Sequence, residues 1–184
     1  MNLYEIDWRY SSIRNIFGTL SESLQTVVDK LHEAEQSGDD IAFDFALEQA
    51  EGLCGIAFVA AQTYIAGTVA DVNRIASSST SLKKDQLLRN YSDDLAQINL
   101  TKLELCDAMA NYFKHHDEWQ RWSGRGRKQK TVAILQTIGI KESDNYPCIK
   151  AVHILLSQDE WDLIPLLKLL SKWRESVIET YKQK

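Results

Sequence analysis

The run ANYFKHHDEWQRW at residues 110–122 gathers the side chains of this chain that are best suited to chemistry. It combines two adjacent histidines with a lysine, an arginine, two carboxylates and two tryptophans. A histidine titrates near neutral pH and is suited to proton transfer, while a neighbouring lysine is suited to holding a phosphate. The candidate catalytic residues for phosphodiester cleavage are Asn111, Lys114, His115 and His116.

The spacing of these residues does not favour a metal site. Consecutive helical side chains point about 100° apart, so His115 and His116 do not face one ion together. No second ligand follows at the i, i+4 spacing of HExxH sites. The three cysteines, Cys54, Cys106 and Cys148, are far apart and form no CxxC pair. We therefore expect no metal, no cofactor and no disulfide, and we expect free thiols in a reducing cytoplasm.

A basic run follows the histidines, although the net charge of the chain is −5. Cationic side chains contact phosphates and aromatic rings stack on bases, but the same residue types also dominate the centres of protein interfaces. The sequence therefore predicts a contact surface over residues 111–130 and leaves RNA and protein open as partners. The candidate binding residues are Trp119, Arg121, Trp122, Arg125, Arg127, Lys128 and Lys130.

A helix end explains the same residues without any function. Cations in the last turn of a helix interact favourably with its dipole, by about 0.3 to 1 kcal/mol each. Lys114 and Glu118 also have the i, i+4 spacing of an ordinary surface ion pair. A structural subunit with no site at this motif therefore stays an alternative.

The remaining sequence is typical of an all-α protein. The chain has 184 residues, of which 44% are hydrophobic, and its two prolines leave long stretches free to be helical. Its length fits a single domain. The net negative charge argues against a surface built wholly for nucleic acid. The acidic N-terminal segment has no apolar core and does not resemble a signal peptide, which favours a cytoplasmic protein.

Apolar residues at spacings of three and four place the helices. The pattern predicts a helix after about residue 85 that is broken near 90–92, with Ser92, Asp93 and Asp94 opening its second part. The central helix is apolar at 53–70, but it contains Gln62, so we interpret it as a buried core helix and not as a membrane span. We predict a single-domain bundle of five or six helices. The other predicted helices cover about 7–37, 39–77, 129–137, 148–156 and 157–181.

The segment ANYFKHH at 110–116 resembles the signature of the HEPN superfamily, whose ribonucleases carry an arginine, a polar residue and, a few residues later, a histidine. Asn111 matches the polar position, and His115 or His116 matches the histidine, with Lys114 before it. The family's arginine would fall on Ala110. The resemblance implies a HEPN-like helical domain over 1–184. It also implies acid/base transfer by the histidine, phosphorane stabilisation by the arginine, no metal, and a site shared across a homodimer.

The missing arginine decides between binding and cleavage. One preorganised donor is worth about 2.7 to 4 kcal/mol in comparable sites, and a lysine lacks the planar fork of arginine. The segments GIAFVAAQTYI and ANYFKHHDEW also resemble small bacterial helical proteins of defence and toxin systems. We therefore interpret the chain as a non-catalytic interaction protein of such a system, an immunity protein or antitoxin, that binds a protein or RNA and no membrane. A metal-independent endoribonuclease that uses His115 is the alternative.

Overall fold

The computed structural model describes residues 3–76, 81–95, 98–119, 121–122, 128–156 and 161–182. In these residues it contains seven α-helices, two 3-10 turns and no strand beyond one isolated bridge, which confirms the all-α bundle. Five or six helices were predicted, and the break in the third stretch gives the seventh. The elements are η1 (Leu3–Glu5), α1 (Tyr10–Ser37), α2 (Asp40–Ile75), α3 (Lys84–Tyr91), α4 (Lys102–His115), η2 (His116–Glu118), α5 (Lys128–Thr137), α6 (Pro147–Leu156) and α7 (Ile164–Lys182).

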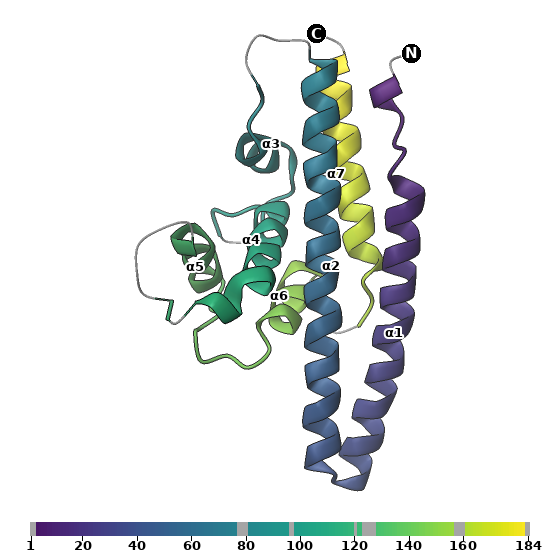
Figure 1. Ribbon diagram of the computed structural model, residues 1–184, viewed down its shortest axis with the longest axis vertical. Coiled ribbons are helices and arrows are strands. Elements are labelled where there is room, and N and C mark those ends of the chain that lie inside the picture. The colour runs from purple at the N-terminus through teal and green to yellow at the C-terminus, as the bar shows by residue number, and fades with distance from the viewer. Residues whose placement is uncertain are drawn as a thin grey trace.

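The two longest helices, α1 and α2, form an antiparallel hairpin (Figure 1). Gly38 ends α1 in the left-handed conformation, with a φ of 69° that costs glycine no steric penalty. Asp39 then caps α2, its carboxylate accepting a hydrogen bond from the Ala42 amide at 3.0 Å. The two caps follow each other directly, so the chain reverses within a very short turn.

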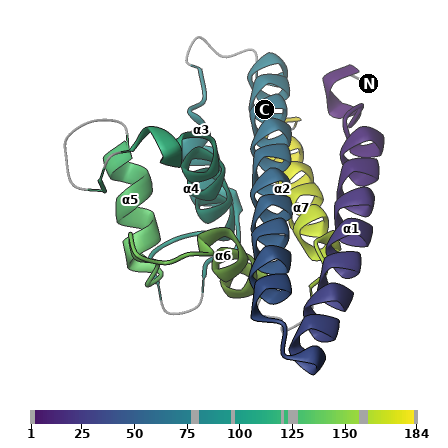
Figure 2. The same cartoon turned by 60° about the horizontal axis from the view of Figure 1, so that its bottom comes forward.

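Helix α2 is the central rod of the bundle, as predicted. It contacts α1, α3, α4, α6 and α7, and α7 lies along it beside α1 (Figures 1 and 2). Gly55 lies so close to the Phe113 ring of α4 that a Cβ there would fall 2.0 Å from the ring. Among the described residues, α2 is the one helix long and apolar enough to span a membrane. Its apolar residues pack on neighbouring helices from several sides, which accounts for its hydropathy.

The start of α4 differs from the predicted position. Ser92 and the two aspartates after it do not open a helix; the chain turns and forms a bridge between Asp94 and Thr101. Thr101 caps α4 instead, in a capping box with Glu104. The Ser92 hydroxyl accepts a hydrogen bond from the Leu103 amide at 3.1 Å. The reciprocal capping box satisfies two helix-end donors at once and outweighs the simple cap at Ser92.

The last two helices were placed with different accuracy. Helix α6 lies within one residue of the predicted range. Helix α7 was predicted from about residue 157, but residues 157–160 lie outside the described part and residues 161–163 are not helical. Pro165 is the second residue of α7, where a missing amide hydrogen costs no helical hydrogen bond. Trp173 of this helix is 1% exposed and fixes α7 in the core.

Candidate functional site at the end of helix α4

The last turns of α4 separate a core face from an exposed face. Ala108, Met109 and Ala110 are buried, while Lys114 and His115 are exposed. A cleft of about 430 Å³ opens beside the exposed face. The cleft brings together four of the predicted residues: Asn111 and His115 from the catalytic set, and Trp119 and Lys128 from the binding set. The cleft is lined by Asn111, His115, Glu118, Trp119, Lys128 and Thr131.

A side-chain amide from the central helix holds two of the candidate residues. The Gln62 amide nitrogen donates to Asn111 Oδ1 at 3.0 Å and to Asp107 Oδ1 at 2.7 Å. The Gln62 Oε1 atom accepts from Lys114 Nζ at 2.5 Å. Asp107 in turn forms an ion pair with Lys84 of α3 at 2.7 Å. Gln62 therefore connects α2 to the cleft and, through Asp107, to α3.

Sequence reasoning missed this role of Gln62 and Asp107. The available signal was the polarity of Gln62 inside an apolar window, because a buried amide needs hydrogen-bond partners. Nothing in the sequence spacing identified the partners, since Gln62 and Asn111 are far apart along the chain.

The two histidines make different contacts. His115 lines the cleft, is 48% exposed, and has its Nδ1 atom 3.3 Å from Glu118 Oε1. His116 stacks on the Tyr112 ring with centroids 5.0 Å apart, and its Nδ1 atom lies 3.1 Å from the Phe113 carbonyl oxygen. The two adjacent imidazoles therefore contact different groups, as expected for consecutive residues at the end of a helix. Among the described residues, no three His, Cys, Asp or Glu side chains are placed to hold a metal ion.

The tryptophans belong to an aromatic cluster around Tyr112. Trp119 and Trp122 meet the Tyr112 ring edge-on, with centroids 5.8 Å and 6.1 Å away. Both tryptophans are half-buried. Burial raises the pKa of Tyr112 to about 12, so its hydroxyl stays neutral. The cluster offers apolar ring area beside the cleft with polar edges toward water.

The basic residues divide into paired and unpaired cations. Lys130 pairs with Asp85 at 2.6 Å, and Lys128 Nζ donates to the Arg121 carbonyl oxygen at 2.6 Å. The exposed Arg121 guanidinium has no acceptor among the described residues. The predicted binding residues Arg125 and Arg127 lie outside the described residues. Among the described cations of this surface, Arg121 is therefore the one most available to a ligand.

Two other features limit the chemistry of the site. The Ala110 side chain is fully buried, so an arginine there would place its guanidinium in the core, where an unpaired charge is very costly. The three cysteines are all buried and free. Burial raises the pKa of each thiol, which keeps it protonated and unreactive.

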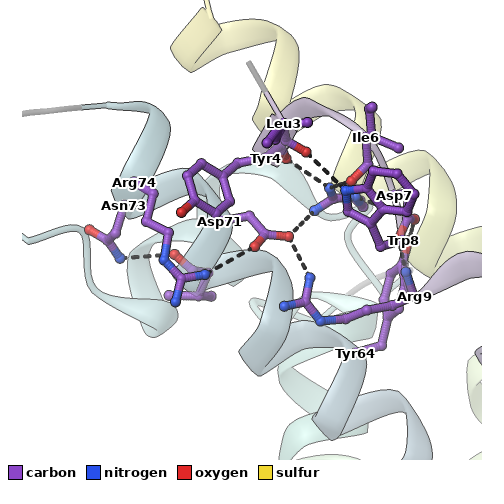
Figure 3. Close-up of polar contacts among 12 residues, drawn as sticks. Leu3, Tyr4, Ile6, Asp7, Trp8, Arg9, Tyr64, Asp71, Asn73 and Arg74 are labelled. Carbon is purple, nitrogen blue, oxygen red and sulfur yellow. Dashed lines mark hydrogen bonds and ion pairs between the residues drawn. The ribbon is translucent and has the colours of Figure 1, made fainter. Parts of the chain in front are cut away.

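A second polar cluster, which sequence reasoning missed, lies where the N-terminal segment meets α2 and α7 (Figure 3). Arg174 is 3% exposed and lies between Asp71, 3.1 Å from its Nη1 atom, and Asp7, 3.3 Å from its Nε atom. Its Nη2 atom donates to the carbonyl oxygens of Tyr4 and Ile6. The guanidinium is therefore surrounded by acceptors that belong to the fold itself.

Two further side chains, from Arg9 and Tyr64, contact the carboxylates of this cluster. Arg9 pairs with Asp71 at 2.5 Å, and the Tyr64 hydroxyl donates to Asp7. Arg174 follows the buried Leu170 by one helical turn, so it stands within the apolar stripe of α7. A charged residue in an apolar stripe is the sequence signal by which this buried ion pair could have been found. We assign this cluster to holding the N-terminal segment in place.

No protein-family model, curated protein or solved structure matches the chain. The resemblance to the HEPN superfamily therefore depends on the short motif at 110–116 and on the helical layout.

Proposed function

We propose that this chain is a non-catalytic binding protein whose contact surface is the cleft at the end of α4 together with the aromatic cluster around Tyr112. One observation carries the proposal: half-buried Trp119 and cationic Lys128 line the same cleft, with the unpaired Arg121 guanidinium in the adjoining segment. Aromatic and arginine side chains supply most of the binding energy of protein interfaces.

The polar contacts favour binding over cleavage. Lys114 is engaged by Gln62, and the position that would carry the family's arginine, Ala110, is a core position. A cleaving site would need a preorganised donor for the phosphorane, worth about 2.7 to 4 kcal/mol. The contact surface therefore has the composition of an interface, and the position of the family's catalytic arginine is held by a buried alanine.

The cations in and beside the cleft, Lys128 and Arg121, favour a partner with negative charge. The resemblance to defence and toxin proteins makes an acidic surface on a toxin or a defence component the partner that we expect, in the cytoplasm. Opposite charges speed association and fix the orientation of the complex. RNA is the competing partner, and a homodimer that shares the cleft is the competing arrangement.

The test is affinity capture with tagged protein from lysate of the source cells, with and without ribonuclease treatment. Arg121→Glu with Lys128→Glu, or Trp119→Ala, is expected to abolish capture, because each removes a central contact. The control Arg14→Glu with Lys168→Glu reverses two exposed cations outside the cleft. Unchanged capture by the cleft variants contradicts the proposal, and capture lost after ribonuclease treatment identifies RNA as the partner.

A second function, metal-independent RNA cleavage, is favoured by one contact. Glu118 lies 3.3 Å from Nδ1 of His115 in the cleft, and a carboxylate at this position orients an imidazole for proton transfer through Nε2. Incubation of the purified protein with total RNA in EDTA tests this function. Absence of cleavage, or cleavage that survives both His115→Ala and His116→Ala, rules it out.

A further inference from the structure

The closed end of the α1–α2 hairpin, residues 29–48, is the strongly acidic end of the molecule; we call it the hairpin tip. It carries seven carboxylates against one lysine, a net charge of −6, whereas the whole chain carries −5. The rest of the chain is therefore close to neutral, and the electrostatic field of the tip is strongly negative. The seven carboxylates belong to Asp29, Glu33, Glu35, Asp39, Asp40, Asp44 and Glu48.

The carboxylates of the hairpin tip are exposed, and most have no partner. Asp29 accepts a hydrogen bond from Gln25, and Asp39 caps α2. The other five form no hydrogen bond or ion pair among the described residues. Elsewhere in the described residues, exposed acids such as Asp85 and Asp93 are paired with lysines. The charge of the tip is therefore not neutralised by the residues that the structure describes.

The hairpin tip also exposes two large apolar side chains. Ile41 is 84% exposed and Phe45 is 66% exposed, and their i, i+4 spacing places them side by side on α2. Phe45 also borders a groove of about 430 Å³ between α1 and α2, whose lining combines Ala34, Ala42 and Ala46 with Lys30, Glu33 and Ser37. A single exposed apolar residue needs no explanation, but a contiguous pair beside a groove marks an interaction surface.

The shape of the fold leaves this surface accessible. The hairpin tip extends beyond the other helices, which pack on the remainder of α2 or, for α5, on α4 (Figure 1). The capped turn at Gly38 and Asp39 holds the two helices together there. A rigid two-helix groove is therefore presented at one end of the molecule.

Charge complementarity selects the occupant. Nucleic acids and anionic membrane surfaces are both repelled by a surface of this charge, although a membrane would accept the exposed Ile41 and Phe45. A protein segment with apolar side chains flanked by lysines or arginines satisfies both properties of the tip. We propose that the hairpin tip is a docking surface for a basic amphipathic helix of a partner protein, which lays its apolar face against Ile41 and Phe45.

The test uses synthetic probe peptides, because the natural partner is not identified. The first is an amphipathic helix with a leucine seam flanked by lysines; the second has the same seam flanked by glutamates. Calorimetry and amide chemical-shift mapping are expected to show binding of the lysine peptide at residues 29–48. The glutamate peptide is expected to bind at least about tenfold more weakly, as is the lysine peptide at high salt.

Matched variants separate the apolar from the charged contribution. Ile41→Ser with Phe45→Ser is expected to weaken the lysine peptide about tenfold or more. Ile56→Ser removes an exposed isoleucine of the same helix outside the tip and is expected to leave binding within about twofold. Asp40→Asn with Asp44→Asn is expected to weaken binding and to flatten its salt dependence, whereas Glu22→Gln on α1 leaves both unchanged.

Four results overturn the proposal. The first three are equal binding of the two peptides, equal loss of binding with Ile56→Ser and with Ile41→Ser plus Phe45→Ser, and chemical-shift changes confined to residues outside 29–48. A fourth is self-association, seen in sedimentation, that Ile41→Ser abolishes, because it assigns the tip to a second copy of the chain. Each substituted residue is exposed, so each variant is expected to keep its helices, and circular dichroism is the measurement that checks this.

Discussion

The polar cluster at Arg174 and the cleft at the end of α4 use the same residue types in opposite ways. Arg174 is 3% exposed and has two carboxylates and two carbonyl oxygens around it. In and beside the cleft, His115 is 48% exposed, and the exposed Arg121 guanidinium has no acceptor among the described residues. The first arrangement consumes all of its interactions within the fold, whereas the second leaves interactions for a ligand.

This difference predicts how energy is divided between folding and binding. Removing one partner of a buried ion pair leaves an uncompensated charge, which is strongly destabilising. Removing an exposed cation changes stability little, because water solvates whatever it leaves behind. We therefore expect the Arg174 cluster to control stability and the cleft to control binding, and the predictions below test that division.

The largest effect is expected from Arg174→Ala. It removes the buried cation that Asp71 and Asp7 share, leaves Asp71 with the more exposed Arg9, and should lower the free energy of unfolding by about 3 to 5 kcal/mol. Urea unfolding measures it. Arg74→Ala is the matched control, because Arg74 contacts the same carboxylate at 3.5 Å but is 52% exposed, and it should cost below about 1 kcal/mol. Equal costs for the two variants would remove the distinction between buried and exposed partners.

A second, smaller effect is expected where α2 packs beneath the cleft. Gly55→Ala places a methyl group against the Phe113 ring, and the displaced ring should cost about 1 to 3 kcal/mol. Gly52→Ala, in the same helix with open space around it, should instead stabilise the protein by up to about 1 kcal/mol. Thermal unfolding of both variants measures the difference. Stabilisation by Gly55→Ala would show that α2 and α4 are less closely packed than described.

Much of the fold was predictable because helical periodicity is a local signal. The apolar stripe of α1 and the caps at Gly38 and Asp39 lie within a few residues of the elements that they define. The start of α4 was placed wrongly because two capping signals compete, and only the one at Thr101 is reciprocal. Local patterns thus placed most helices and failed where a local choice depended on a second contact.

The candidate site was only partly predictable, for the opposite reason. Asn111 and His115 are one turn apart on a helix, so their shared cleft follows from spacing. Gln62 contacts Asn111 from another helix, and Arg174 contacts Asp71, which is far away along the chain. Such contacts depend on how helices pack in space, which the periodicity of a single sequence does not encode.

A third prediction concerns Glu51, whose half-buried carboxylate has no cationic partner in the described part of the chain. It accepts hydrogen bonds from the Cys148 and Ile149 amides at 2.8 Å and 2.9 Å, at the start of α6. Glu51→Gln leaves one acceptor oxygen for two amides and should cost about 0.5 to 1.5 kcal/mol at acidic pH. This cost in unfolding free energy is expected to lie between the cost of Arg174→Ala, which removes a buried cation, and the cost of a substitution in the exposed cleft.

The pH dependence of this variant has a definite sign. Burial raises the pKa of Glu51 above its ordinary value of 4.5, so the folded protein holds this proton more tightly than the unfolded chain. The resulting stability is present below pH 4.5 and is lost as the pH rises through the folded-state pKa. The difference between wild type and Glu51→Gln should therefore shrink on going from pH 4 toward neutral pH in urea unfolding. A difference that grows with pH would contradict it; Glu22→Gln controls for an exposed carboxylate.

The smallest effect on stability, and a large one on binding, is expected from His115→Ala. The imidazole is half exposed, and its contact with Glu118 is a surface pair at 3.3 Å, so the free energy of unfolding should change by no more than about 0.5 kcal/mol. Partner capture should fall sharply, because the ring lines the cleft. Arg14→Ala, on the exposed face of α1 and outside the hairpin tip, should change neither quantity. A cost above about 1 kcal/mol with unchanged capture would instead place His115 among the residues that hold the fold, and the end of α4 would then be a structural helix end without a site.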